Sequence, residues 1–160
     1  IETLKKRWAK NFPVLNKKVL FTNTLSLLEF ISLCKCVNVL LDPLYFGGGN
    51  SFLEAMLVGT PTITMPGTHL KTNITSAAYK QMKILNPPIV QSSEEYINLA
   101  VKLAKNSKIN FSLREESKTG ANKYLYNNLK ALQEFEHFLK EAHITAQSGN
   151  KLKDGYKIEF

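Results

Sequence analysis

Three consecutive glycines, Gly47 to Gly49, constrain the fold of this chain more than any other feature of its sequence. They follow an apolar run, residues 37–41, whose length and composition predict a buried strand. Asn50 and Ser51 come next, and both residue types commonly cap the start of a helix. A strand, a glycine turn and a helix N-terminus present backbone N–H groups and a positive dipole end to a phosphate. The sequence therefore predicts a phosphate-binding turn, with a plain strand-to-helix connection as the alternative.

The composition is that of an ordinary globular chain of one-domain size. Of its 160 residues, 44% are apolar and 21% are charged, which is typical of neither disordered nor membrane-spanning proteins. No apolar run approaches the roughly 18 residues that a transmembrane helix needs, so we expect no membrane partner. The sequence begins in a helical pattern without an initiator Met or a secretory signal, and we therefore expect a piece of a longer protein.

The net charge of +8 favours an acidic ligand such as a nucleotide sugar. It does not by itself indicate nucleic-acid binding, because the basic residues are spread along the chain. Only two of the 21 basic residues are Arg, whose planar guanidinium is favoured for recognising bases and phosphates. We therefore expect no nucleic-acid partner.

The only two cysteines, Cys34 and Cys36, stand close together near the expected end of a helix. A zinc site would need two further ligands, and His69, His137 and His143 are not spaced to supply them. Adjacent turns also place the two sulfurs poorly for a disulfide. We expect both to be core thiols in a reducing compartment, the cytoplasm, and we predict no metal.

Strands and helices alternate along most of the chain, which predicts an α/β fold with a parallel sheet covered on both faces. The first strand is expected at 18–22, with Val19, Leu20 and Phe21 buried, and a helix then begins at Thr24 or Ser26. The further expected strands lie at 37–41, 61–65 and 89–90, and the further helices at 1–10, 50–58, 70–82 and 92–104. Such sheets bind ligands at the carboxyl ends of their strands, where the glycine turn is expected.

From Ile109 onward the pattern is helical only. One long helix carries an apolar stripe, made of Leu129, Leu132, Phe135, Phe138, Leu139 and Ala142. Such a stripe is typical of core packing, and here we expect it to dock the helix on a neighbouring lobe. We therefore expect the whole chain to consist of three segments. These are an incomplete α/β lobe at 1–126, a long amphipathic helix of the same domain at 127–145, and a polar tail at 146–160.

Four motifs occur in a specific order: Leu41-Asp42-Pro43, the turn and helix at 46–56, Gly59-Thr60-Pro61, and the segment 64–67. In this order and spacing they resemble the carboxyl lobe of the O-linked N-acetylglucosaminyltransferase and SPINDLY-like glycosyltransferases. That family has the two-lobed GT-B architecture, and the likeness extends over about residues 21–142. It implies a partial doubly wound, Rossmann-like parallel sheet followed by C-terminal helices.

The resemblance implies a nucleotide-sugar donor site on the glycine turn. Gly48, Gly49, Asn50 and Ser51 would bind the diphosphate through backbone N–H groups and short side chains. Glu54, on the same helix, would accept hydrogen bonds from the ribose hydroxyls. As the alternative, Glu54 would only complement the helix dipole.

The resemblance also implies where the base would bind. Phe30 would stack on the base, and the backbone near Leu25 would contact the base edge. His69 follows a Pro-Gly turn and is a further candidate near the phosphates. The alternatives are a core role for Phe30 and a solvated loop position for His69.

Three departures from the family pattern stand out. Gly49-Asn50-Ser51 replaces the His-Thr-Thr or Asn-Thr of many relatives, a variant associated with bacterial SPINDLY-like members. Leu27 occupies the place of a ribose-contacting Lys, and Asn73 stands where relatives often have an Arg. The first of these replacements supports a particular branch of the family, and the Leu27 replacement removes one donor contact.

By this resemblance the protein would transfer N-acetylglucosamine from UDP-N-acetylglucosamine to Ser or Thr hydroxyls of a protein acceptor, without a metal or other cofactor. UDP and GDP both stay open as the donor nucleotide. The general base, the N-terminal lobe and tandem helical repeats are expected upstream, so this lobe alone should be inactive. Two alternatives are a nucleotide-sugar epimerase of the same architecture and a non-catalytic module that keeps the fold.

Overall fold

Two short parallel strands lie at the centre of the computed structural model, which describes residues 2–157. They are β1 (Leu40–Leu41) and β2 (Thr62–Ile63), with Leu40 opposite Thr62. A third segment lies beside β2, where Thr64 and Ile89 form a parallel bridge. The predicted parallel sheet is therefore present, although its strands are shorter than the sequence indicates. Prolines next to these segments contribute to the shortness of the strands, because proline has no N–H to donate to a neighbouring strand.

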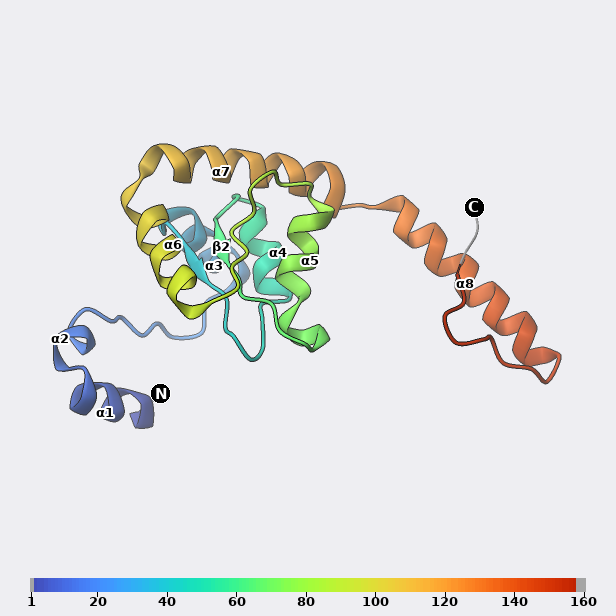
Figure 1. Cartoon of the computed structure of the whole chain (residues 1–160), viewed down its shortest axis with the longest axis horizontal. Coiled ribbons are helices and arrows are strands. Elements are labelled where there is room, and N and C mark those ends of the chain that lie inside the picture. The colour runs from blue at the N-terminus through green and yellow to red at the C-terminus, as the bar shows by residue number, and fades with distance from the viewer. Residues whose placement is uncertain (1, 158–160) are drawn as a thin grey trace.

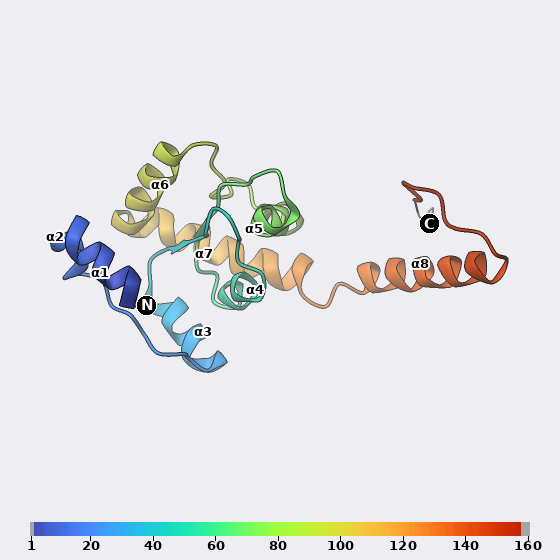
Figure 2. The same cartoon turned by 90° about the horizontal axis from the view of Figure 1, so that it is seen from below.

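Helices surround this small sheet and form the body of the molecule (Figure 1). They are α3 (Leu27–Cys36), α4 (Asn50–Met56), α5 (Ile74–Gln81), α6 (Ser93–Lys105) and α7 (Ser107–Gly120). A 3-10 turn, η1 (Leu70–Thr72), precedes α5, and a π-helical turn, η2 (Ala121–Leu125), continues α7. Figure 2 shows α3 and α4 on the same side of the body, with α6 on the other.

Side-chain caps fix the starts of three of these helices, α3, α6 and α7, the last through Asn106, which accepts from the Ile109 N–H. Ser26 and Glu29 form a reciprocal capping box at α3, in which the Ser26 N–H donates to Glu29 Oε2 at 2.8 Å. Ser92 caps α6 by accepting from the Glu95 N–H. The expected cap at α4 is wrong, because Gly49 is its N-cap and Asn50 is already helical.

A hydrophobic core lies between the sheet and its helices. Phe52 of α4 and Tyr79 of α5 are both buried, and their rings meet edge to face with centroids 5.2 Å apart. The Tyr79 hydroxyl accepts a hydrogen bond from the Thr62 N–H at 2.8 Å, which ties α5 to β2. Burial raises the pKa of Tyr79, so the hydroxyl stays neutral in this position.

Helix α7 crosses the body, and a glycine allows close packing at two places: Gly59 against α7, and Gly120 of α7 against the end of α5. A Cβ added at Gly59 would lie 2.1 Å from the Arg114 carbonyl oxygen, and one at Gly120 would lie 2.6 Å from the Met82 carbonyl oxygen. The Arg114 guanidinium donates to Val37 O at 2.7 Å and to Thr60 Oγ1 at 3.0 Å. Helix α7 therefore holds together the segments that follow α3 and α4.

Two helical arms extend from the body (Figure 1). At the N-terminal end, α1 (Glu2–Asn11) and α2 (Pro13–Asn16) pack on each other. At the other end, α8 (Leu129–Gln147) carries the predicted apolar stripe, but none of its residues is buried. The following segment turns back so that the Tyr156 ring lies 6.4 Å from that of Phe138. Residues 158–160 of the predicted tail lie outside the described residues.

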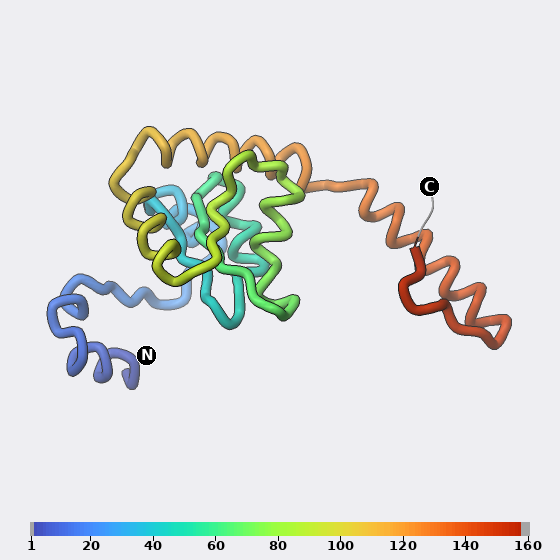
Figure 3. The backbone as a smooth tube through the Cα atoms, viewed as in Figure 1, coloured from blue at the N-terminus to red at the C-terminus, as the bar shows by residue number. Residues whose placement is uncertain are grey.

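The strand predicted at 18–22 is wrong. This segment is an irregular connection between α2 and the body (Figure 3), and Leu20 is 91% exposed. The N–H groups of Lys18 and Val19 donate to Leu15 O and Asn16 O in a local turn, not to β1. A strand forms only where another strand can pair with it, so a strand-like residue pattern at 18–22 is not sufficient.

The cysteine prediction is correct for one residue and wrong for the other. Cys34 is buried in α3, and burial, followed by the nearby Glu54 carboxylate, raises the pKa of its thiol. Cys36 is exposed at the last turn of α3. Both are free thiols.

The contact of α7 with the end of α4 predicts the effect of a methyl group at Gly59. Its φ is +69°, and an added Cβ would clash with Arg114 O, so Gly59→Ala should lower the free energy of unfolding by about 2 kcal/mol or more. Gly149 has a φ of +75° with nothing within 4 Å, and Gly149→Ala should cost at most about 1 kcal/mol. Urea denaturation followed by circular dichroism measures both; equal losses would contradict this close packing.

Candidate functional site

An open pocket of about 450 Å³ lies between the start of α3 and the first two turns of α4. Its lining residues are Thr22, Asn23, Leu25, Ser26, Leu27, Phe30, Ser51 and Glu54. Leu25, Phe30, Ser51 and Glu54, predicted separately for the base, the phosphate and the ribose, therefore share one pocket. The two helices contact each other, and Figure 2 shows them side by side.

Glu54 supplies the only carboxylate of this pocket. Its side chain is half-buried, and within residues 2–157 it has neither a hydrogen-bond donor nor an ion-pair partner. An unpaired carboxylate can accept hydrogen bonds from hydroxyl groups with both of its oxygens. The arrangement therefore leaves Glu54 available to a polyhydroxylated ligand.

Phe30 has two roles in the structure. It packs against the hydrophobic core cluster, and it also lines the pocket. An aromatic wall held in place by the core is suited to stacking on a planar base. Leu27, which replaces the expected Lys, lines the same pocket and brings no charge to it.

The glycine turn lies beside this pocket and uses its backbone N–H groups in two ways. Gly47 N–H donates to Lys71 O at 2.8 Å, and Gly48 N–H donates to Asp42 Oδ1 at 2.6 Å. The next three N–H groups, of residues 49–51, have no acceptor among the described residues. Gly49 has a φ of −96°, so it needs no left-handed conformation. A Cβ placed on it would meet nothing within 4 Å, so this side of the turn is open.

Asp42 is a site residue that the sequence interpretation treated only as a strand end and part of a motif. It is 5% exposed, and its Oδ2 accepts from Thr64 Oγ1 at 2.7 Å. Its main-chain carbonyl accepts from the Tyr96 hydroxyl at 2.9 Å. Burial, and after it the Asp42 charge, raises the pKa of Tyr96 to about 12. An acidic residue between a buried strand and a glycine turn is the sequence signal that could have identified it.

The start of α5 also meets the glycine turn. Thr75 Oγ1 donates to Gly48 O at 3.4 Å, and Asn73 Nδ2 donates to both Gly67 O and His69 O at 2.8 Å. Asn73, where relatives often have an Arg, thus closes the loop before α5. Two helix N-termini, those of α4 and α5, therefore contact the turn, and both favour an anion there.

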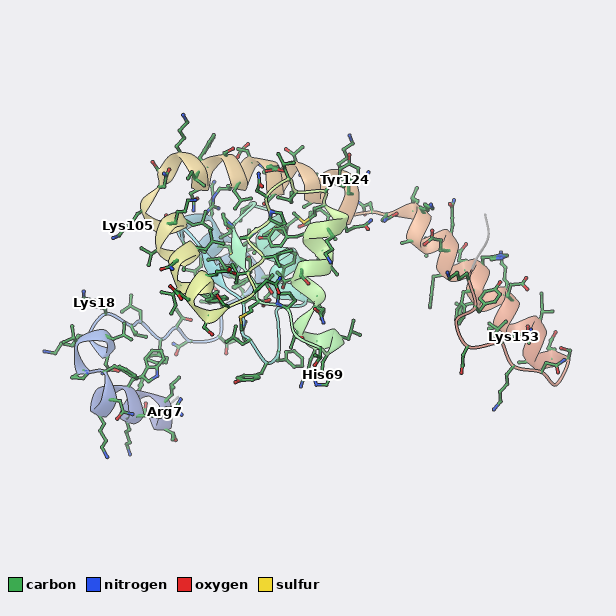
Figure 4. The ribbon with its side chains drawn as sticks, viewed as in Figure 1. Arg7, Lys18, His69, Lys105, Tyr124 and Lys153 are labelled. Carbon is green, nitrogen blue, oxygen red and sulfur yellow. The ribbon has the colours of Figure 1, made fainter. Side chains whose placement is uncertain are left out.

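His69 is not part of the pocket that holds Glu54. It is exposed, and it lines a separate hollow of about 460 Å³ with Leu70, Lys71 and Ile74. Figure 4 shows it at the edge of the body, where η1 begins. The structure therefore groups the predicted base and ribose residues but leaves His69 apart from them.

A hollow of about 500 Å³ lies elsewhere, between residues 86–88 and helices α6 and α7. Lys102, Lys108 and Glu116 are its charged lining residues, and none of the residues predicted for donor binding belongs to it. Glu116 already accepts a hydrogen bond from the Leu85 N–H at 2.7 Å. This hollow is therefore separate from the candidate site.

Within residues 2–157, no three His, Cys, Asp or Glu side chains are grouped in a way that could hold a metal ion. None of the helices described there is long and apolar enough to cross a membrane.

Comparisons with known proteins identify relatives of the chain. The model of glycosyl transferase family 41 matches residues 2–134. Among solved structures, the chain is similar to a mutant O-GlcNAc transferase from Thermobaculum terrenum, with a TM-score of 0.72 and 21% identity. The match covers 89% of this chain and 26% of that chain, so this chain spans about a quarter of that relative's length. No curated protein matches the chain. At this identity the structural likeness shows the fold, and it confirms the predicted carboxyl-lobe α/β architecture.

Proposed function

The chain belongs to glycosyl transferase family 41, and from that membership we propose that it is the donor-binding lobe of a protein O-glycosyltransferase. One observation carries the proposal: Phe30 and the unpaired Glu54 share a pocket beside backbone N–H groups that lack acceptors. In a nucleotide sugar, the base is complementary to the aromatic ring, the ribose to the carboxylate, and the diphosphate to the free N–H groups.

The proposed donor is UDP-N-acetylglucosamine, with a GDP sugar as the alternative. The base stacks on Phe30 and its edge meets the backbone at Leu25, while Glu54 accepts hydrogen bonds from the ribose hydroxyls. The diphosphate binds at residues 49–51, where two helix N-termini and the net charge of +8 favour an anion. Leu27 cannot make the ribose contact that a Lys would make, so the affinity for the donor depends on fewer charged contacts.

The proposed reaction is an inverting displacement. A Ser or Thr hydroxyl oxygen of the acceptor forms a bond to the anomeric carbon, and the bond from that carbon to the diphosphate oxygen breaks. The nucleoside diphosphate leaves with the electron pair, and the backbone N–H groups at residues 49–51 stabilise its increasing negative charge. The hydroxyl proton passes to a general base that we place outside residues 2–157. In this scheme the N–H groups and helix dipoles offset the charge, and no metal or other cofactor is proposed.

The remaining parts of the enzyme are proposed to lie in the parent protein. They are an N-terminal lobe with the acceptor site and tandem helical repeats, in a cytoplasmic, SPINDLY-like enzyme. The exposed stripe of α8 supports this proposal, because Leu129, Leu132 and Phe135 have no partner in the core and would be covered by a neighbouring lobe. This lobe alone is then inactive.

Two other functions are less well supported. An epimerase would need a carboxylate and a histidine close together at the glycine turn, and His69 does not line the pocket of Glu54. A non-catalytic module is favoured by Leu27 and by the replaced phosphate turn at residues 49–51. Sugar transfer to a peptide by the parent protein, lost in Glu54→Ala, would exclude it.

Glu54→Gln tests the ribose contact in the full-length parent. Affinity for the nucleotide sugar should fall about tenfold, because the amide offers one acceptor oxygen and no charge. Binding of inorganic pyrophosphate should barely change, since it has no ribose. Glu136→Gln, which makes the same charge change at an exposed position of α8, is the matched control. Isothermal titration calorimetry measures all three proteins, and equal losses for both ligands would assign Glu54 a structural role.

Gly49→Val tests the diphosphate contact. The position is open, with nothing within 4 Å of an added Cβ, so the variant should fold and its side chain should block the approach of the diphosphate. Donor binding should become undetectable, while thermal unfolding should show a folded protein. Unchanged donor affinity in a folded variant would disprove a phosphate site at this turn.

A further inference from the structure

We propose that Asp42 is a positioning residue of this site. Its carboxylate accepts the hydrogen bond of the Gly48 N–H, so that only the N–H groups of residues 49–51 remain to contact the diphosphate. This inference rests on the proposed donor-binding function, and it revises the assignment of Gly48 as a diphosphate ligand. Asp42 itself contacts no part of the donor.

Asp42 is anchored through every polar group that it has. Its N–H donates to Ile63 O at 2.9 Å, which continues the pairing of β1 with β2. Its carbonyl accepts from the Tyr96 hydroxyl, and its Oδ2 accepts from Thr64 Oγ1 at 2.7 Å. The β2 segment and α6 therefore hold the main chain of Asp42, Thr64 holds Oδ2 of its carboxylate, and Oδ1 accepts from the Gly48 N–H.

This anchoring fixes the path of the turn. The contact between Asp42 Oδ1 and Gly48 N, at 2.6 Å, is charge-assisted and therefore stronger than a neutral hydrogen bond. A Cβ on Gly47 would lie 3.1 Å from Asp42 Oδ2, so the turn also lies tightly against this carboxylate. The N–H groups of Gly47 and Gly48 are directed into the protein, and those of residues 49–51 are left without an acceptor.

The charge of Asp42 supports a positioning role instead of a ligand contact. A carboxylate and a diphosphate repel each other, so a direct approach would weaken binding. The Asp42 carboxylate is buried and its oxygens are occupied by Gly48 and Thr64. It therefore acts through the backbone that it orders. A neutral residue of the same shape should replace it well, whereas a residue without an acceptor should not.

The experiment uses the full-length protein that contains this chain. Asp42→Ala should weaken UDP binding at least about tenfold, because the turn loses its charged acceptor. Asp42→Asn keeps an acceptor oxygen for Gly48 and should bind UDP within about threefold of the unaltered protein. Thr64→Val removes the other partner of the carboxylate without changing its charge, and it should give an intermediate loss. Calorimetry measures affinity, and circular dichroism confirms folding.

A second readout does not depend on donor binding. In protein labelled with ¹⁵N-glycine, the Gly48 amide should exchange with solvent more slowly than the Gly49 amide, and Asp42→Ala should remove this difference. Added UDP should shift the Gly49 resonance more than that of Gly48. Equal exchange of the two glycines in the unaltered protein, or unchanged UDP affinity in a folded Asp42→Ala variant, would overturn the inference. Absence of binding of both UDP and GDP to the unaltered protein would instead overturn the proposed function, and the exchange result would still decide the role of Asp42.

Discussion

The Arg114 guanidinium is the interaction on which the geometry of the site depends. From α7 it reaches carbonyl or hydroxyl oxygens of Val37, Val58 and Thr60, which follow the ends of α3 and α4. A cation at helix C-termini is favourable for the helix dipoles. The same two helices carry Phe30 and Glu54, which line the pocket, so Arg114 ties together the segments that follow both pocket-lining helices. A residue that does not line the pocket thus connects the helices that carry its proposed base and ribose contacts.

Asp42 exerts a second, separate control over the glycine turn. Arg114 positions two helices, whereas Asp42 determines which backbone N–H groups of the turn remain without acceptors. The two constraints act on neighbouring parts of one site, the first on the base and ribose region and the second on the diphosphate region. Both are charged groups that are fully or partly buried and satisfied by hydrogen bonds, so removing either would leave polar backbone groups unpaired. The ligand side of the site remains open at Gly49, and the protein side is held by the hydrogen bonds of Asp42 and Arg114.

Local signals in the sequence predicted much of this fold. The helix start at Thr24 or Ser26, which the structure places at Ser26, the helix after Ser92 and the glycine turn are encoded within a few residues, and all three are present. Features that depend on distant partners could not be predicted in the same way. Residues 18–22 have a strand pattern, yet they lack a neighbour to pair with, and the length of β1 and β2 depends on the whole sheet. Asp42 stands out in the sequence as an acidic residue before the glycine turn, but its partners Thr64 and Tyr96 are 22 and 54 residues away, so the folded chain is needed to identify them.

A crystal structure of the full-length parent, grown with whichever of UDP and GDP binds more tightly, tests the central claim most directly. We expect the base against Phe30, the ribose hydroxyls within hydrogen-bonding distance of Glu54, and the diphosphate against the N–H groups of residues 49–51. A nucleotide bound outside this pocket, or a ribose directed away from Glu54, would contradict it.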